Sequence, residues 1–346
     1  MIKRELVPGY EISPVIKGGW QLSSGHSLNL QIQEDQAIND MITFIESGIT
    51  TLDFGDIYTG VEELIGKTLS KLSHKSGSDA RNRLQLHTKY VPNESFLSKF
   101  DSSDAIAIVN RSLSRLGVDQ VDLVQLHWWR YEDRHYLAAL ERLFELKSAG
   151  KIANIGITNF DLTRVEEMVD AGLKPASHQI QYSMLDRRTE LGMSQYCLDN
   201  EIGIICYGTV AGGFFSEKFL DAPEPTQVET RSNVKYQIII EEFGGWDLFQ
   251  ELLRACKLIA ENHSTDIATI ASAWVLQRPA VKAVIVGARN ISHLDSNLQI
   301  PQIVFTASEL ASIDQILDKS AGPSGPVYDL ERYSEKHRAI MHTNNN

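Results

Sequence analysis

Short apolar segments alternate along this chain with stretches of helical periodicity. The apolar segments are rich in Val, Ile and Leu, which is typical of parallel strands whose two faces are both buried. Eight segments are predicted as strands, at residues 15–19, 50–54, 84–89, 121–127, 152–158, 176–181, 202–207 and 281–286.

The intervals between these segments predict amphipathic helices. Between Asp101 and Gly117, apolar side chains recur at every third or fourth position, and these two residues are suited to begin and end a helix. The same pattern precedes Gly150 and Pro279. Eight strands alternating with helices predict a single (β/α)₈ TIM barrel over residues 1–346. An open doubly wound sheet would need a G-x-G-x-x-G turn after the first strand, and the sequence has none there.

Three further segments complete this prediction. Residues 1–13, with Pro8-Gly9 at a turn, predict a hairpin that caps the N-terminal end of the barrel. Residues 208–245 predict a long loop at the C-terminal end of a strand, where barrel enzymes carry substrate and cofactor loops. Residues 322–346 predict a polar C-terminal tail, disordered at residues 344–346.

Composition narrows the possible partners. The chain has 33 basic and 45 acidic side chains, a formal net charge of −12, which argues against nucleic acid or an anionic membrane as a partner. No stretch approaches the ~18 apolar residues of a membrane span. Three cysteines without a C-x-x-C pair indicate a reducing compartment, and we expect a cytoplasmic protein. The oligomeric state is not readable from the sequence.

Ionisable residues gather at the C-terminal ends of three consecutive predicted strands. Asp53 ends the second strand and Tyr58 follows it closely, while Lys89 and His127 end the third and fourth strands. Each of the four has an ordinary structural explanation when taken alone. Lys and Asp are seldom buried unless paired, so we expect Asp53 and Lys89 to pair.

This set of residues is suited to proton transfer to a carbonyl oxygen. A phenol is a weak acid near neutral pH, and we expect the Lys89 ammonium to stabilise the Tyr58 phenolate. Asp53 would keep Lys89 charged, and His127 would donate to the same oxygen or orient the substrate. The predicted strand ends carry no nucleophilic Ser or Cys, and no residues have metal-ligand spacing, so no metal is expected.

The same residues resemble the aldo-keto reductase family along nearly the whole chain. Residues 48–60, followed by Glu62 and Gly66, are similar to the family signature around its catalytic Asp and Tyr. The further matching motifs follow in the family's order and are Thr88-Lys89, Leu126-His127-Trp128, Gly156 to Phe160, Gln179 to Ser183 and Val286 to Asn290.

The resemblance implies a catalytic tetrad of Asp53, Tyr58, Lys89 and His127, with Tyr58 as the general acid in reduction. It also implies a nicotinamide cofactor bound without a Rossmann fold, to residues in three groups. Those expected at the carboxamide are Thr158, Asn159 and Gln179; Tyr207 is expected to stack on the ring; and those expected at the phosphates and adenosine are Gly208, Gly287, Arg289 and Asn297.

Arg289 matches a family position facing the 2′-phosphate, which favours NADPH as cofactor, with NADH as the alternative. The sequence departs from the family at Ser296, where many members have a glutamate whose carboxylate contact a serine cannot reproduce. We expect a small-molecule carbonyl substrate beside Trp20 and Trp128, and nothing in the sequence selects a particular aldehyde, ketone or sugar.

Two other functions fit parts of this pattern. A catalytically weak NADPH-binding sensor or regulatory subunit of the same fold would retain the cofactor residues. An unrelated barrel enzyme could use Lys89 as a Schiff-base amine, but pairing with Asp53 should keep that amine protonated and poorly nucleophilic.

Overall fold

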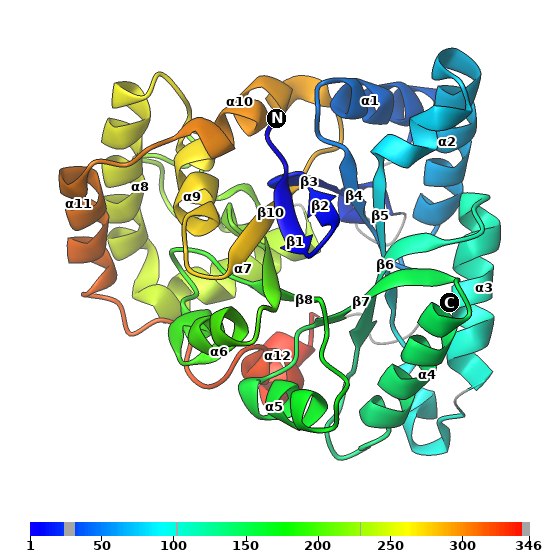
Figure 1. Cartoon of the computed structure of the whole chain (residues 1–346). Helices are drawn as coiled ribbons and strands as arrows, with labels where there is room; N and C mark the ends of the chain where they lie inside the picture. Colours follow the sequence, from blue (N-terminus) through cyan, green and yellow to red (C-terminus); the bar gives the residue numbers. More distant parts are fainter. Residues whose placement is uncertain (24–31, 102, 229, 341–346) are drawn as a thin grey trace.

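The chain forms a closed barrel of eight parallel strands in a computed structural model that describes residues 1–23, 32–101, 103–228 and 230–340 (Figure 1). The strands lie in the order β10-β3-β4-β5-β6-β7-β8-β9 around the barrel. Their bounds are β3 (Val15–Gly18), β4 (Thr51–Asp53), β5 (Gln85–Tyr90), β6 (Val121–His127), β7 (Ile152–Thr158), β8 (Ser177–Gln181), β9 (Gly203–Tyr207) and β10 (Val281–Gly287). All eight coincide with predicted strands, which confirms the (β/α)₈ barrel.

Helices surround the barrel and follow from the amphipathic pattern (Figure 1). The Asp101 side chain accepts a hydrogen bond of 2.9 Å from the backbone N–H of Ser103, and Gly117 follows the last turn with φ +67°. No described helix is both long and apolar enough to cross a membrane. The helices outside the barrel are α1 (Glu34–Glu46), α2 (Val61–Ser76), α3 (Ser103–Leu116), α4 (Tyr136–Ser148), α5 (Leu162–Asp170), α6 (Met193–Asp199), α8 (Gly245–Asn262), α9 (Ile267–Leu276), α10 (Leu294–Gln299) and α11 (Ala307–Leu317).

An antiparallel hairpin of β1 (Arg4–Val7) and β2 (Tyr10–Ile12) closes one end of the barrel, as predicted. Its side chains Leu6 and Ile12 are buried in one cluster with residues of the barrel interior. The Tyr10 hydroxyl lies 2.9 Å from Nε2 of His87 on β5. Because the hairpin plugs this end, the open mouth of the barrel lies at the carboxyl ends of the strands.

The segment 208–245 differs from its prediction as a long loop, since it contains helix α7 (Arg231–Phe243). The Thr230 hydroxyl caps this helix by accepting a hydrogen bond of 3.1 Å from the backbone N–H of Asn233. Tyr236, Ile239, Ile240 and Phe243 are all buried. Their spacing is that of an amphipathic helix, a signal that the glycines and prolines of the segment obscured.

The C-terminal tail also differs from its prediction, because much of it is ordered structure that lies against the barrel. It contains α12 (Asp329–Tyr333) and α13 (Glu335–Arg338). Tyr328, Glu331, Arg332 and His337 are buried, so a segment that is polar in sequence packs by satisfying its charges internally. Residues 344–346, predicted to be disordered, lie outside the described residues.

Candidate active site

The structure joins Asp53 and Lys89, which come from neighbouring strands, in a buried ion pair. Lys89 Nζ lies 2.6 Å from Asp53 Oδ1, and each side chain is only 5% exposed. Lys89 also donates to the carbonyl oxygen of Phe54 at 2.8 Å. Burial alone would lower the pKa of Lys89, but the Asp53 charge outweighs it and raises that pKa. Lys89 is therefore an ammonium and not a free amine, which argues against Schiff-base chemistry.

Two glutamines complete the surroundings of the Asp53 carboxylate. Gln125 on β6 donates to Asp53 Oδ2 at 2.9 Å, and Gln179 on β8 donates to the same oxygen at 2.6 Å. Gln179, which was predicted to bind the nicotinamide carboxamide, therefore donates its side-chain N–H group to Asp53 in this structure. Sequence reasoning missed Gln125, although its position two residues before His127 places both side chains on the inner face of β6.

Tyr58 lies on the turn after β4 with its ring half-buried beside Lys89. Lys89 Nζ is 5.2 Å from the centre of the Tyr58 ring. Burial raises the pKa of Tyr58 and outweighs the opposing effect of the Lys89 charge. The Lys89 charge still favours the phenolate, so it limits the rise in pKa and keeps the proton transferable.

His127 ends β6 as a neutral imidazole. Burial, reinforced by the charge of Arg332, lowers the pKa of His127 to about 3. Its Nδ1 lies 3.4 Å from the carbonyl oxygen of Thr158, whereas its Nε2 is buried without a hydrogen-bond partner among the described residues. The contact at Nδ1 is too long for a strong hydrogen bond, so little free energy is lost when the imidazole carries its proton on Nε2 instead. A proton on Nε2 is available to a substrate oxygen.

The remaining residues predicted at the nicotinamide gather on β7 to β9. Thr158 is buried at the end of β7, and Asn159 follows it with φ +62°. The Tyr207 hydroxyl donates to Asn159 Oδ1 at 2.8 Å, and the Tyr207 ring is half-buried at the end of β9. Gln179 joins them through its backbone carbonyl, which accepts from the Asn159 N–H at 3.0 Å.

The residues predicted at the phosphates and adenosine follow β9 and β10. Gly208 has φ +77°, and a Cβ atom there would lie 2.0 Å from the Tyr236 hydroxyl, so only glycine fits between β9 and α7. Gly287 ends β10, Arg289 is exposed two residues later, and Asn297 lies largely buried on α10.

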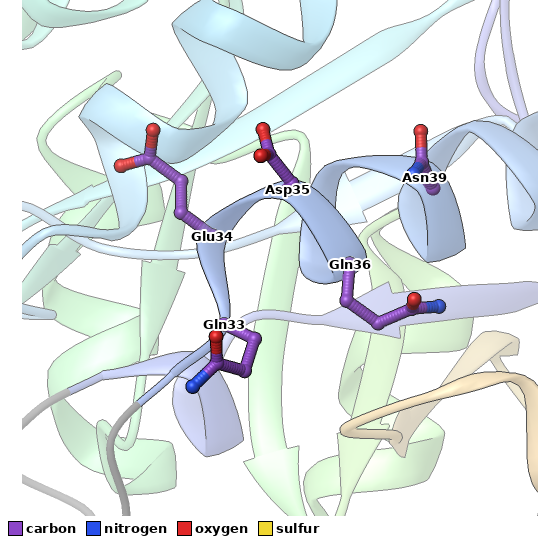
Figure 2. A pocket seen from close by; sticks show the side chains of 5 residues that line it. All are labelled: Gln33, Glu34, Asp35, Gln36 and Asn39. Carbon is purple, nitrogen blue, oxygen red and sulfur yellow. The ribbon is translucent and has the colours of Figure 1, made fainter.

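Arg289 and Asn290 form one wall of a cleft of about 200 Å³ whose other wall includes residues of α1. Gln33 and Gln36 line this cleft and also a neighbouring hollow with Glu34, Asp35 and Asn39 at the start of α1 (Figure 2). The hollow carries two carboxylates and no cation among its lining residues, so it does not suit a phosphate group.

The two predicted substrate residues, Trp20 and Trp128, differ in their position relative to the site. The Trp20 ring lies 5.0 Å from the Tyr58 ring, which places it at the site. Trp128 is fully buried and donates its indole N–H to the carbonyl oxygen of Asp133 at 2.6 Å, so it presents no surface to a substrate. The ring of the next residue, Trp129, lies edge-on to His127 at 4.4 Å. Adjacent residues beyond a strand face opposite sides, so Trp129 rather than Trp128 lies beside His127.

The ordered tail adds residues that the sequence analysis did not place at the site. The Tyr328 ring lies edge-on to His127 at 5.7 Å. Arg332 Nη2 donates to the carbonyl oxygens of Trp128, at 2.9 Å, and Asn159, at 2.7 Å. The spacing of Val327, Tyr328 and Leu330 was the only sequence signal for an amphipathic segment here. Among the described residues, no group of His, Cys, Asp or Glu is arranged to hold a metal ion.

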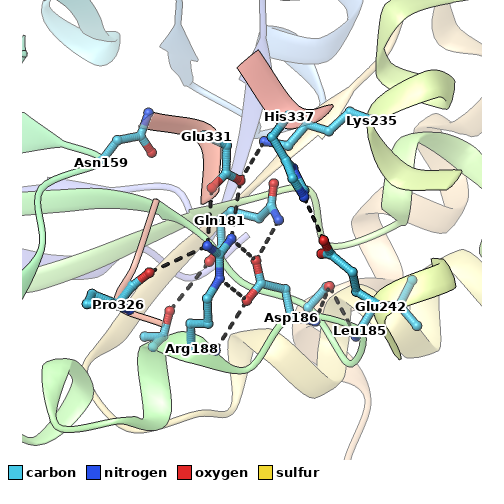
Figure 3. Close-up of polar contacts among 12 residues, drawn as sticks. Asn159, Gln181, Leu185, Asp186, Arg188, Lys235, Glu242, Pro326, Glu331 and His337 are labelled. Atoms are coloured by element: carbon cyan, nitrogen blue, oxygen red, sulfur yellow. Dashed lines mark hydrogen bonds and ion pairs between the residues drawn. The ribbon is translucent and has the colours of Figure 1, made fainter. Parts of the chain in front are cut away.

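A buried ion cluster anchors the tail to the barrel (Figure 3). Arg188, in the connection after β8, pairs with Asp186 at 2.7 Å and with Glu331 of α12 at 3.2 Å. Lys235 of α7 pairs with the same Glu331 at 3.3 Å. The cluster therefore joins three segments that are distant in sequence and fixes α12 over the strand ends.

Replacing Glu331 with Gln is expected to destabilise the protein by about 3 kcal/mol or more, because it leaves buried cations without their partner. The free energy of unfolding from urea titration near neutral pH measures this loss. Glu241→Gln is the matched control, since Glu241 joins α7 to the tail residue Lys336 in an exposed pair. The control should cost less than about 1 kcal/mol. Equal effects of the two changes would contradict the anchoring role.

The same cluster predicts a loss of stability in acid. Burial would raise the pKa of Glu331, but Lys235 and Arg188 outweigh burial and lower it from 4.5 to about 2. A depressed folded-state pKa contributes stability above the unfolded value of 4.5, and that contribution is lost as the pH falls toward 2. Urea titrations across this range should show a steeper decline for the wild type than for Glu331→Gln, and parallel curves would contradict the assignment.

Comparison with known proteins agrees with this geometry. Residues 14–318 match the model of the aldo/keto reductase family. Aldo-keto reductase YhdN of Bacillus subtilis is 25% identical over 334 residues, which cover 92% of this chain and 95% of the relative. The chain therefore belongs to the aldo/keto reductase family, as the resemblance of its motifs predicted.

Two solved structures share the fold. The thermostable aldo-keto reductase Tm1743, solved with the inhibitor epalrestat, superposes with a TM-score of 0.72 at 25% identity and covers 91% of this chain and 100% of its own. An aldo-keto reductase from Klebsiella pneumoniae, solved with NADPH, gives a TM-score of 0.67 at 21% identity and covers 92% of this chain and 96% of its own.

Proposed function

We propose that this protein reduces the carbonyl group of a small aldehyde or ketone to an alcohol, with NADPH as the hydride donor. The observation that carries the proposal is the position of the Lys89 ammonium, 2.6 Å from Asp53 and 5.2 Å from the Tyr58 ring centre. An acid whose conjugate base is stabilised by a fixed buried cation is what a carbonyl oxygen needs as it gains negative charge.

In this mechanism the Tyr58 hydroxyl donates its proton to the carbonyl oxygen. Lys89 stabilises the phenolate that forms, and its attraction is strengthened because the ammonium is buried. Asp53, held by Gln125 and Gln179, keeps Lys89 charged and aimed. His127 donates from Nε2 to the same oxygen and so holds the carbonyl in place. In the reverse direction the Tyr58 phenolate accepts the proton of the alcohol.

The residues after β7, β9 and β10 fit a nicotinamide dinucleotide. Thr158, Asn159 and Tyr207 would hold the nicotinamide, which supplies the hydride when bound, while Gly208, Gly287, Arg289 and Asn297 would hold the phosphates and adenosine. Gln21 supports this fit, because its side chain lies beside Gly287 and its Oε1 is buried with no partner among the described residues. A ribose hydroxyl is a donor of the kind that this oxygen requires.

Turnover of a panel of aldehydes and ketones, followed by the loss of NADPH absorbance with NADH in parallel, tests the proposal. Reduction of at least one carbonyl compound with NADPH supports it. Tight NADPH binding without turnover of any compound contradicts it and favours the sensor function instead.

The proposed preference for NADPH depends on Arg289. We expect Arg289→Leu to weaken NADPH binding about tenfold to a hundredfold, the value of a charge-assisted hydrogen bond, and to leave NADH binding nearly unchanged. Fluorescence titration with both cofactors measures this. Arg83→Leu, an exposed arginine next to the amino end of β5, is the control. An equal loss of affinity for both cofactors would show that Arg289 does not read the 2′-phosphate.

The proposed setting is the cytoplasm, and the cysteines are consistent with it. Cys197, Cys206 and Cys256 are all free and buried. Burial raises the pKa of each thiol, so all three behave as inert core side chains. Free thiols persist in a reducing compartment.

A further inference from the structure

Arg332 of the C-terminal tail lies immediately beyond the catalytic histidine. His127 and Thr158, the last residues of β6 and β7, are paired in the sheet. Arg332 Nη2 donates to the carbonyl oxygens of the next two residues, Trp128 at 2.9 Å and Asn159 at 2.7 Å. The guanidinium therefore lies against the chain immediately beyond these two strand ends, on the side of the barrel mouth.

This guanidinium is buried without a counter-charge. Arg332 is 2% exposed, and its Nε and Nη1 have no hydrogen-bond partner within the part of the chain that the structure describes. No ion pair forms between Arg332 and any described carboxylate, and the adjacent Glu331 pairs with Arg188 and Lys235. The contacts of its planar face are aromatic, with Tyr131 at 4.0 Å and Tyr328 at 5.1 Å.

Burying a cation without a counter-charge costs free energy. The ion cluster around Glu331, rather than a counter-charge, holds the Arg332 side chain in place. Removing a guanidinium from water costs several kcal/mol unless an anion or enough hydrogen bonds replace the solvent. The Glu331 cluster fixes α12 without using the Arg332 side chain (Figure 3). The Nε–H and Nη1–H donors lie on different edges of the planar guanidinium, so each is free to bind a single acceptor oxygen.

We propose that Arg332 binds an anionic group of the substrate, so that the preferred substrates are aldehydes or ketones that carry a carboxylate or phosphate. The Tyr328 ring contacts both His127, at 5.7 Å, and the guanidinium, at 5.1 Å. The same ring therefore borders the expected position of the substrate carbonyl and that of the anionic group. The inference rests on the proposed carbonyl reduction.

A role for Arg332 in holding the cofactor phosphates is disfavoured by the barrel order. The residues proposed for the phosphates and adenosine follow β9 and β10, whereas Arg332 contacts the ends of β6 and β7. Going around the closed barrel, β6 lies four strands from β10 and β7 lies two strands from β9, so Arg332 contacts strand ends on the side of the mouth away from β10.

The test compares 4-carboxybenzaldehyde with its uncharged methyl ester in the wild type, Arg332→Met and Arg332→Lys. We expect the wild type to prefer the acid in kcat/KM by about tenfold or more, the value of one charge-assisted contact. Arg332→Met should lose this preference, because the KM for the acid rises by more than the KM for the ester. Arg332→Lys should retain part of it. Lys336→Met, an exposed tail cation, is the matched control and should keep the preference.

Companion measurements separate the possible sources of the anion. 4-Formylphenyl phosphate against 4-methoxybenzaldehyde shows whether phosphate is accepted as well as carboxylate, and preference for either anion supports the proposal. NADPH affinity should change far less in Arg332→Met than the preference for the acid does. Weaker NADPH binding by the variant, without any preference for anionic substrates in the wild type, assigns Arg332 to the cofactor and overturns the proposal.

The wild-type protein alone can also overturn the inference if Arg332→Met fails to fold. Benzoate should then inhibit the reduction of a neutral aldehyde more strongly than benzamide, and equal inhibition contradicts the anion site. If neutral aldehydes are reduced but acids are not preferred, this inference fails while the proposed function stands. If no carbonyl compound is reduced, the proposed function fails, and equal binding of benzoate and benzamide in calorimetry overturns the anion site as well.

Discussion

Tyr58→Phe is expected to lower the rate of carbonyl reduction by about 10²- to 10⁴-fold, the contribution typical of a positioned general acid. The change removes only the hydroxyl, and the ring keeps its contact with Trp20 at 5.0 Å. NADPH affinity and the free energy of unfolding should change little. Single-turnover reduction of an active aldehyde measures the effect.

Tyr333→Phe serves as the control for Tyr58→Phe. Tyr333 lies in α12 with 51% of its surface exposed, and its hydroxyl has no place in the proposed chemistry. It should retain the wild-type rate. If Tyr58→Phe also retains that rate with a substrate that the wild type reduces, the proton comes from another group and the assignment of the acid is wrong.

Lys89→Met is expected to lower kcat by about 10²- to 10³-fold, in the range found when a group that stabilises developing charge is removed. The proposed role of Lys89 is to stabilise the phenolate, so NADPH affinity should change far less than kcat. Retained NADPH binding also shows that the variant is folded, which matters because Asp53 loses a buried partner.

The control for this variant is Lys282→Met on β10, a half-buried lysine outside the proposed site. Its kcat should equal that of the wild type. Equal losses of kcat and NADPH affinity in Lys89→Met would instead assign Lys89 to cofactor binding.

The barrel was predictable because each strand carries its own signal. A strand buried on both faces must be apolar in sequence, and a charged residue such as Lys89 is then conspicuous where such a run ends. Strand ends on one side of a barrel also meet, so the sequence alone predicts that Asp53 and Lys89 pair. The prediction of the fold and of this pairing used only local sequence and general barrel geometry.

The parts that sequence did not reveal depend on contacts between distant segments. Arg332 and Tyr328 reach the site because Glu331 pairs with Arg188 and Lys235, and no local pattern marks a surface charge that will become buried. That Trp129 rather than Trp128 lies beside His127 depends on the local path of the chain after β6, which the type of side chain does not determine. The net pKa of Tyr58 likewise depends on how strongly burial opposes the Lys89 charge.

The ion cluster around Glu331 bears on the order in which the protein assembles during synthesis. Arg188 and Lys235 leave the ribosome well before Glu331, and β10, which closes the barrel, also precedes it. Until α12 is synthesised, Lys235 lacks its carboxylate partner and Arg188 lacks one of its two, so we expect both cations to remain hydrated. Docking of α12 should then dehydrate both cations together, so we expect the site to be completed only after the strands of the barrel.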